Sequence, residues 1–254
     1  MVLDTIENFS NMAVKKVKFL NSSISRYFAM SILASIYVGF AVILIISIGA
    51  PLHASGNPFL KTLIGVAFGI ALSLVLFAGA ELFTSNNMIM TIGVLDKKIK
   101  ITSLIKLWIA CYLGNFVGGI LLAFAMKASG LIKGDAAIFT GYLAHYKASA
   151  PFLKLLVKGI LCNILVCLAV WTGARTKNDA AKLTLIFWCL FAFISSGFEH
   201  SVANMTLITL ATITTKAVNI NDLFHNIVPV TLGNIIGGAL LGAVYFFVAK
   251  NKKQ

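Results

Sequence analysis

The chain has 254 residues, of which 59% are hydrophobic and 11% are charged, and its mean hydropathy is +0.94. This composition excludes a soluble globular protein and indicates an all-α polytopic membrane protein. The formal net charge of +13 at pH 7 comes from basic residues scattered over several short loops. That distribution is typical of membrane topology and of attraction to anionic lipid, and it disfavours a nucleic-acid partner.

Residues 1–27 are predicted to form an amphipathic helix on the cytoplasmic surface of the lipid bilayer. Basic side chains, Lys15, Lys16 and Lys18, lie opposite an apolar face with helical spacing. The apolar face consists of Ile6, Phe9, Ala13, Val17 and Leu20. A cleavable signal peptide is disfavoured, because its basic region would begin too late and the apolar run after Arg26 is a full crossing.

Residues 28–249 are predicted to form the transmembrane domain, and residues 250–254 a short cytoplasmic tail. An apolar helix needs about 20 residues to cross the hydrocarbon core. The six apolar segments that reach this length are 29–49, 62–95, 104–126, 152–174, 183–213 and 228–249. The second and fifth are too long for one crossing, and each carries a glutamate near its middle, where charge is costly. We therefore expect both to be broken helices.

The distribution of basic residues predicts the orientation. Most Lys and Arg residues fall in the terminal segments and in the loops on the same side as the termini. The smaller set on the other side consists of Lys61, Lys127, Lys133, Lys147, Lys154 and Lys216. Because retained cytoplasmic loops collect Lys and Arg, we expect both termini to face the cytoplasm.

An internal repeat divides the chain into two halves, at about residues 28–127 and 150–249. Four small or polar positions recur at an offset of 118, namely Gly79, Glu81, Asn86 and Thr91 with Gly197, Glu199, Asn204 and Thr209. The motif GNFVGG at 114–119 returns as GNIIGG at 233–238. Three crossings per half is an odd number, so the second half must run through the membrane in the opposite direction, as in many channels and transporters.

The two breaks predict a site for an anion at the middle of the membrane. The half-helices that follow the breaks are expected to begin near Asn87 and near Asn204, with both N-terminal ends directed at the midplane. Glu81 and Glu199 are expected to stabilise the breaks by accepting backbone N–H groups that have lost their helical partners. A direct role in transport is the alternative for these carboxylates.

His200 is the strongest candidate for a functional side chain. Its repeat partner is Leu82, so the shape of the break does not explain it. An imidazole can donate a hydrogen bond or a proton to the anion of a weak acid; the alternative is a buried histidine bonded to a backbone carbonyl. Lys158, inside an apolar crossing, either attracts anions, or snorkels toward the membrane surface, or pairs with a buried glutamate. Candidate polar partners, which could instead serve helix packing, are Thr84, Asn163 and Asn234.

A membrane enzyme that uses Glu81, Glu199 and His200 for acid–base chemistry is the alternative from another class. The sequence offers it little support, because the remaining histidines fall in outer loops and no metal-ligand spacing accompanies them. The four cysteines lie in apolar segments without a Cys-x-x-Cys pair. We therefore expect no cofactor, no metal site and no disulfide framework.

Four segments together resemble the formate/nitrite transporter family. They are ELFTSN at 81–86, Asn163 with VCLAVW at 166–171, GFEHSVAN at 197–204 and PVTLGNIIGG at 229–238. The resemblance spans all six crossings, and within the family the chain is most similar to the hydrosulfide channel branch. It implies an aquaporin-like protomer in a homopentamer, with a separate pore through each protomer, in the inner membrane of a bacterium.

By the same resemblance, His200 is the central pore histidine, Thr84 is the polar residue at the first break, and Asn163 and Asn234 support them. The implied hydrophobic constrictions around the histidine are Phe68, Leu72, Leu82, Phe83 and Phe193. The implied function is a channel for small monovalent anions, with hydrosulfide as the main substrate and formate and nitrite also permeating. A proton-coupled formate or nitrite transporter is the alternative within the family.

Overall fold

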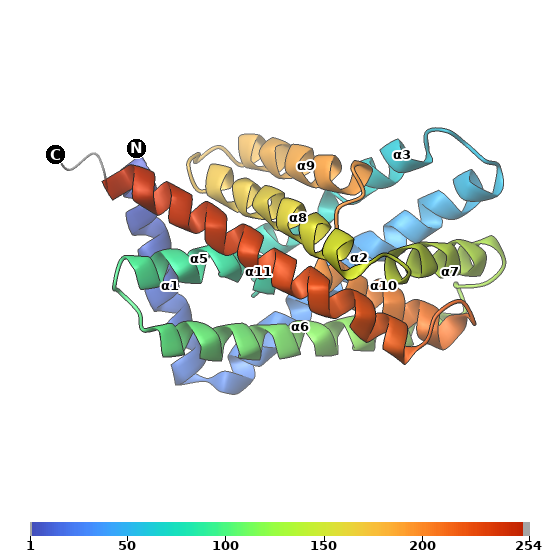
Figure 1. The fold of residues 1–254 in the computed structure, drawn as a ribbon, viewed down its shortest axis with the longest axis horizontal. Coiled ribbons are helices and arrows are strands. Elements are labelled where there is room, and N and C mark those ends of the chain that lie inside the picture. Colours follow the sequence, from blue (N-terminus) through green and yellow to red (C-terminus); the bar gives the residue numbers. More distant parts are fainter. Residues whose placement is uncertain (1, 251–254) are drawn as a thin grey trace.

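Four long helices form the body of the molecule and pack as two pairs (Figure 1). The computed structural model describes residues 2–250, whose regular elements are all helices. In the first half α2 (Ile24–Ala54) packs along α6 (Ile101–Ser129), and in the second half α8 (Phe152–Gly173) packs along α11 (Ile220–Lys250). Residues 251–254, most of the expected cytoplasmic tail, lie outside the described residues.

Each pair depends on a glycine from the repeated motif. A side-chain carbon on Gly118 of α6 would collide with the carbonyl oxygen of Ile32 in α2, and one on Gly237 of α11 would collide with that of Ile160 in α8. Only glycine allows two helix backbones to approach so closely. The sequence repeat is therefore also a repeat of helix packing.

The six expected crossings are present in the described part of the chain. Five stretches are each long and apolar enough to cross a membrane: Ile24–Ala54, Leu60–Gly79, Ile101–Ser129, Phe152–Gly173 and Ile220–Ala249. The remaining crossing is divided between α9 (Asp179–Ser195), which has 17 residues, and the shorter apolar helix α10 (Ser201–Thr214).

The second crossing is interrupted at residues 80–82. The elements before the interruption are α3 (Leu60–Ala67), α4 (Ile70–Leu74) and a π-helical turn (Val75–Gly79). After it, α5 (Phe83–Leu95) completes the crossing. Gly79 closes the first part with a φ of +77°, and its counterpart Gly197 closes α9 with a φ of +74°. Both need the left-handed conformation that glycine adopts without steric cost.

The two half-helices begin earlier than the sequence suggested. They start at Phe83 and Ser201, not near Asn87 and Asn204, so those starting points are wrong by about one helical turn. The asparagines need not lie in the breaks, because their side chains reach the glutamates from inside the first turn of each half-helix. From the middle of the molecule, α5 and α10 extend toward opposite ends (Figure 1).

A helix that was not expected occupies the loop between the third and fourth crossings. This helix, α7 (Asp135–Ala148), packs against α2 and α10 and buries Phe139 and Ala144. It precedes the first crossing of the second half, just as α1 (Val2–Ser22) precedes the first crossing of the first half. Each half of the fold therefore contains four parts, a short leading helix followed by three crossings.

The leading helix α1 lies within the segment for which an amphipathic helix is expected. Its apolar residues Ile6, Phe9 and Ala13 are buried, and the helix packs chiefly against α5. The ring of Phe9 stacks on Trp171 of α8 at 5.4 Å between centroids, and Trp171 stacks on Tyr245 of α11 at 3.9 Å. This stack connects the start of the chain to both halves of the fold.

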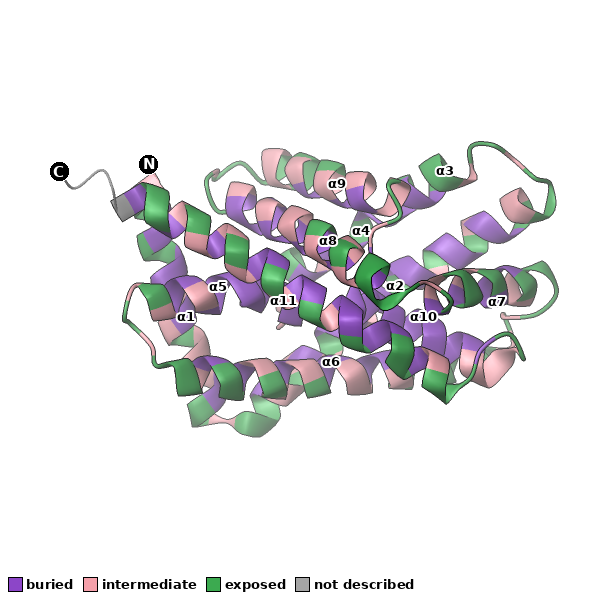
Figure 2. Ribbon diagram, viewed as in Figure 1, coloured by how far each residue is buried: buried purple, intermediate pink, exposed green. Residues whose placement is uncertain are grey.

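The distribution of burial is the reverse of that in a soluble protein. Figure 2 shows α5 and α10 buried over most of their length, although both contain asparagine, serine and threonine. Many outward-facing residues of the long helices are large and apolar, such as Phe40, Ile109 and Leu240. A polar interior inside an apolar exterior places any functional chemistry at the centre, where the two half-helices meet.

Candidate functional site

The first break is held open by the side chain of Asn115. Its amide oxygen accepts from the backbone N–H of Phe83 at 2.9 Å, and its amide nitrogen donates to the carbonyls of Ser31 at 2.6 Å and Glu81 at 3.0 Å. The N–H of Glu81 donates to the carbonyl of Met30 at 3.2 Å. These bonds satisfy backbone groups that lost their helical partners at the break.

The second break has the same construction, with Asn234 in place of Asn115. Its oxygen accepts from the N–H of Ser201 at 2.9 Å, and its nitrogen donates to the carbonyls of Gly159 at 2.8 Å and Glu199 at 3.1 Å. The N–H of Glu199 donates to the carbonyl of Lys158 at 3.3 Å. Asn234 therefore shapes the second break through these three bonds. Asn115 does the same work, and its place in the repeated GNFVGG motif was the signal for it.

The carboxylate of Glu81 lies in a cluster of side-chain donors. The ammonium of Lys16 on α1 is 2.7 Å from both carboxylate oxygens. The hydroxyl of Tyr27 donates at 3.0 Å, and the amide of Asn86 donates at 3.0 Å. The side chain of Glu81 is 12% exposed, so this ion pair is partly open to its surroundings.

Glu199 is bound in a matching way but is more deeply buried, with 1% exposure. The ammonium of Lys147 on α7 lies 2.9 Å from its carboxylate, and the amide of Asn204 donates at 2.7 Å. The expectation that the glutamates accept backbone N–H groups is wrong, because lysine and asparagine side chains occupy both carboxylates. The breaks are capped by Asn115 and Asn234 instead.

His200 and Thr84 meet where the N-terminal ends of the two half-helices converge. The imidazole Nε2 lies 3.0 Å from the hydroxyl oxygen of Thr84, and the imidazole Nδ1 accepts from the backbone N–H of Ala203 at 3.1 Å. A backbone N–H can only donate, so Nδ1 carries no proton and the ring is neutral with its proton on Nε2. His200 therefore donates to Thr84, and its one N–H is aimed at the other half of the molecule.

Asn163 fixes the backbone that carries Thr84. Its amide donates to the carbonyl of Thr84 at 3.2 Å and to the side-chain oxygen of Asn87 at 3.1 Å, and it also bonds the carbonyl of Asn234. Cys167, one turn along α8, contributes a weak S–H bond to the same Thr84 carbonyl at 3.6 Å. Asn163 thus ties both breaks to α8, and its hydrogen bonds go to Thr84, Asn87 and Asn234 and not to His200.

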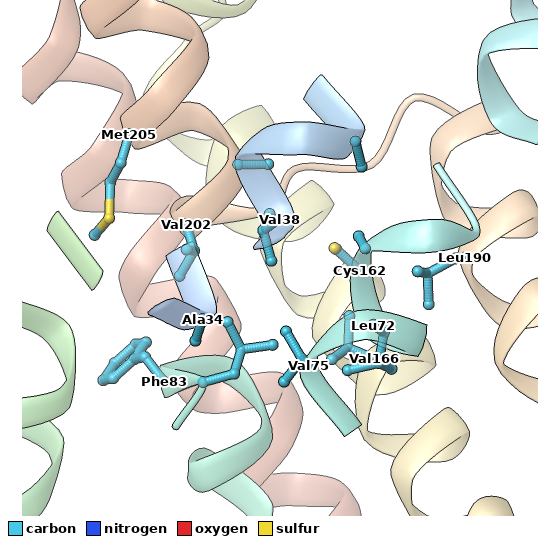
Figure 3. Close-up of a cluster of buried hydrophobic side chains, with 14 of the residues drawn as sticks. Ala34, Val38, Leu72, Val75, Phe83, Cys162, Val166, Leu190, Val202 and Met205 are labelled. Atoms are coloured by element: carbon cyan, nitrogen blue, oxygen red, sulfur yellow. The ribbon is translucent and has the colours of Figure 1, made fainter. Parts of the chain in front are cut away.

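A small apolar cavity lies beside the imidazole. Four of the expected constriction residues line it together with His200, and these are Phe68, Leu72, Leu82 and Phe193. Its volume is about 10 Å³, too small to hold more than about one water molecule. The other side chains that line it come from four helices and were not expected: Val38, Ala71, Val166 and Leu190. Leu72, Val166 and Leu190 lie close together in Figure 3.

Two expected site residues lie elsewhere. Phe83 is not among the residues that line the cavity, and its ring packs edge-on against Trp108 at 6.3 Å and Tyr112 at 5.0 Å. The first residue of α5 points toward α6, because Leu82 before it takes the position beside the histidine. Lys158 directs its ammonium over the ring of Tyr146, 5.3 Å from the centroid, and pairs with neither glutamate.

The family model named formate/nitrite transporter matches residues 3–248. The chain belongs to the formate/nitrite transporter family. It is 38% identical over 256 residues to the nitrite transporter NirC of Escherichia coli, a match that covers 99% of this chain and 94% of NirC. It is 33% identical to the formate channel FocA of Haemophilus influenzae, covering 95% of this chain and 90% of FocA.

Solved structures of this family have the same fold. A structure titled FNT family ion channel is 36% identical and superimposes with a TM-score of 0.91, covering 96% of this chain and 98% of that one. A pentameric formate channel with formate bound is 29% identical, with a TM-score of 0.82 and coverage of 91% and 98%. The fold expectation is thereby confirmed. As a member of the formate/nitrite transporter family, the chain is a membrane channel protein for small anions and not an enzyme.

Proposed function

We propose that this chain conducts small monovalent anions of weak acids past His200. The observation that supports the proposal most strongly is the bond between His200 and Thr84, which joins the two half-helices at their N-terminal ends. By likeness to the pentameric formate channel, the chain forms a homopentamer with one conduction path in each protomer. It lies in the inner membrane of a bacterium with both termini in the cytoplasm.

The electrostatic attraction for an anion comes from the helix ends. Lys16 and Lys147 are each neutralised by a glutamate, so neither contributes a free charge in this arrangement. The N-terminal ends of α5 and α10 each carry the equivalent of about half a positive charge, and both are directed at the same region. An anion at the centre is therefore attracted by the equivalent of about one positive elementary charge in total.

The apolar cavity opposes the passage of a bare ion. Transfer of an ionised group into such surroundings without a partner costs far more free energy than transfer of a hydrogen-bonded neutral group. The Nε2–H of His200 is the donor that can replace water on the anion, after the anion displaces the hydroxyl of Thr84. The neutral imidazole keeps this proton and supplies a hydrogen bond. A weak-acid anion that takes up a proton from the solvent crosses the apolar side chains as a neutral molecule, which favours weak acids over chloride.

The experiment is an anion flux measurement in proteoliposomes with the native chain, His200→Asn and Thr84→Val. Asparagine is a strong N-cap residue, so His200→Asn keeps an acceptor for the N–H of Ala203 while removing the imidazole N–H. We expect rapid formate and nitrite flux and slow chloride flux for the native chain, and at least a tenfold loss of formate flux for His200→Asn. Unchanged formate flux in a correctly assembled His200→Asn channel would disprove the role of the histidine.

The same liposomes address the main substrate. Hydrosulfide stays our prediction from the sequence, whereas the relatives described above are named for nitrite and formate. Parallel measurements with hydrosulfide, formate and nitrite rank the three anions directly. Luminal pH recorded at the same time separates a channel from proton-coupled transport, since only coupled transport drives the substrate against its own gradient when a pH gradient is imposed.

A further inference from the structure

An apolar groove of about 590 Å³ runs between the N-terminal parts of α2 and α6, outside the conduction path. One wall is formed by Ile24 and Phe28 of α2, and the other by Ile105, Ile109 and Leu113 of α6. The helices are locked together further along, where Gly118 meets Ile32. The groove lies at the end where both helices begin.

The dimensions of the groove match one leaflet of a bilayer. Its α6 wall extends from Thr102 to Leu113. At about 1.5 Å per residue these eleven steps span about 17 Å. The hydrocarbon core is about 30 Å thick, so one leaflet contributes about 15 Å. An extended acyl chain that enters from the surface would therefore lie along the groove for most of its depth in that leaflet.

The polar end of the groove is basic. Lys106 is the charged residue that lines it, and its ammonium reaches back to the side-chain oxygen of Asn21, 3.4 Å away, just before α2 begins. In a bilayer we expect this ammonium at the level where lipid headgroups meet the first turns of the helices. Among the described residues its partner is an amide oxygen and not a carboxylate, so no carboxylate of that part of the chain neutralises its positive charge. Arg26, in the first turn of α2, is exposed close by in sequence.

We propose that this groove is a binding site for an anionic phospholipid, with one acyl chain between α2 and α6 and the phosphate at Lys106. Basic pockets at helix ends on the cytoplasmic side are the type of site that binds anionic headgroups. A second copy of the chain is the competing occupant, and it would have to bring a carboxylate to Lys106. Four of its eight acidic residues, Glu81, Asp96, Asp179 and Glu199, already pair with lysines of their own chain.

The test is native mass spectrometry of the delipidated full-length assembly, titrated with phosphatidylglycerol or with phosphatidylcholine of the same acyl chains. We expect the native chain to prefer phosphatidylglycerol, and Lys106→Gln to bind it about fivefold more weakly with little change for phosphatidylcholine. The matched control is Lys127→Gln, which removes an exposed lysine from the last turn of the same helix. It should retain the native preference.

A second variant separates the acyl chain from the headgroup. Ala110→Phe fills the groove without changing charge, so it should weaken the binding of both lipids while leaving anion flux as in the native chain. Equal phosphatidylglycerol binding by the native, Lys106→Gln and Ala110→Phe chains would overturn the proposal. Disulfide-linked dimers formed by Ile109→Cys, but not by the native chain, would also overturn it, because they would place a second copy on the groove.

Discussion

Removal of Lys147 should destabilise the protein more than removal of Lys16, although the two lysines have equivalent roles. Lys147→Met leaves the carboxylate of Glu199, which is 1% exposed, with one strong donor, the amide of Asn204. Breaking a buried ion pair costs about 3 to 5 kcal/mol. Because the amide of Asn204 still donates to the carboxylate, we expect a cost at the lower end, about 3 kcal/mol. For a protein of this size that lowers the thermal midpoint by about 6 °C or more.

Lys16→Met should have a smaller effect. Glu81 is 12% exposed and keeps two donors, the hydroxyl of Tyr27 and the amide of Asn86. A partly exposed pair contributes about 1 kcal/mol at most, which corresponds to about 2 to 4 °C. The expected difference in stability between the two variants therefore comes from how deeply the glutamate that loses its lysine is buried.

The assay is the thermal midpoint of the purified assembly in detergent, followed by size-exclusion chromatography after heating. The double variant Lys147→Met with Glu199→Gln removes the uncompensated charge, so it should recover most of the loss, and the amide oxygen of glutamine can still accept from Asn204. A midpoint for Lys16→Met as low as that for Lys147→Met would refute the reasoning. So would a double variant no more stable than Lys147→Met alone.

Three further predictions test other parts of the fold. Gly197→Ala should lower the free energy of unfolding by about 1 to 2 kcal/mol through backbone strain, because φ is +74°. An added side-chain carbon would meet nothing within 4 Å, so no steric clash adds to this cost. A loss in thermal midpoint well above about 8 °C would contradict this. Asn234→Ala leaves buried backbone groups at the second break unpaired, at a cost of about 1 to 3 kcal/mol for each. Both the stability and the formate flux should therefore fall. Native-like flux would show that the break keeps its shape without Asn234. Phe9→Ala removes the stack on Trp171, so trypsin should cleave α1 faster at Lys15 and Lys16 than in the native chain, and an equal rate would mean that the stack does not hold the helix.

The sequence was sufficient for the arrangement of the crossings because a membrane imposes strict rules on length and charge. The breaks at Glu81 and Glu199 were predictable from a charge inside an over-long apolar segment. His200 could be singled out because its repeat partner Leu82 has no comparable chemistry. Each of these inferences needed only local sequence and the repeat.

The lysine partners of the two glutamates were not predictable in the same way. Glu81 and Glu199 are 118 residues apart, but Lys16 and Lys147 are 131 apart, chiefly because α2 has 31 residues whereas its counterpart α8 has 22. A repeat search with one fixed offset therefore aligns Lys16 with Gly134 and misses the pairing. The ion pair between Lys147 and Glu199 is a tertiary contact. It also depends on α7, a helix in a segment that the sequence analysis treated as an outer loop.

The unequal pair formed by His200 and Leu82 has a consequence for how such a fold can arise. Both side chains line the same small cavity from related positions. A pore built from two identical shorter chains would have to place the same residue at both positions, either two imidazoles facing each other or two leucines and no donor. Joining the halves in one polypeptide removes that constraint, so that one half can specialise in chemistry while the other keeps the wall apolar.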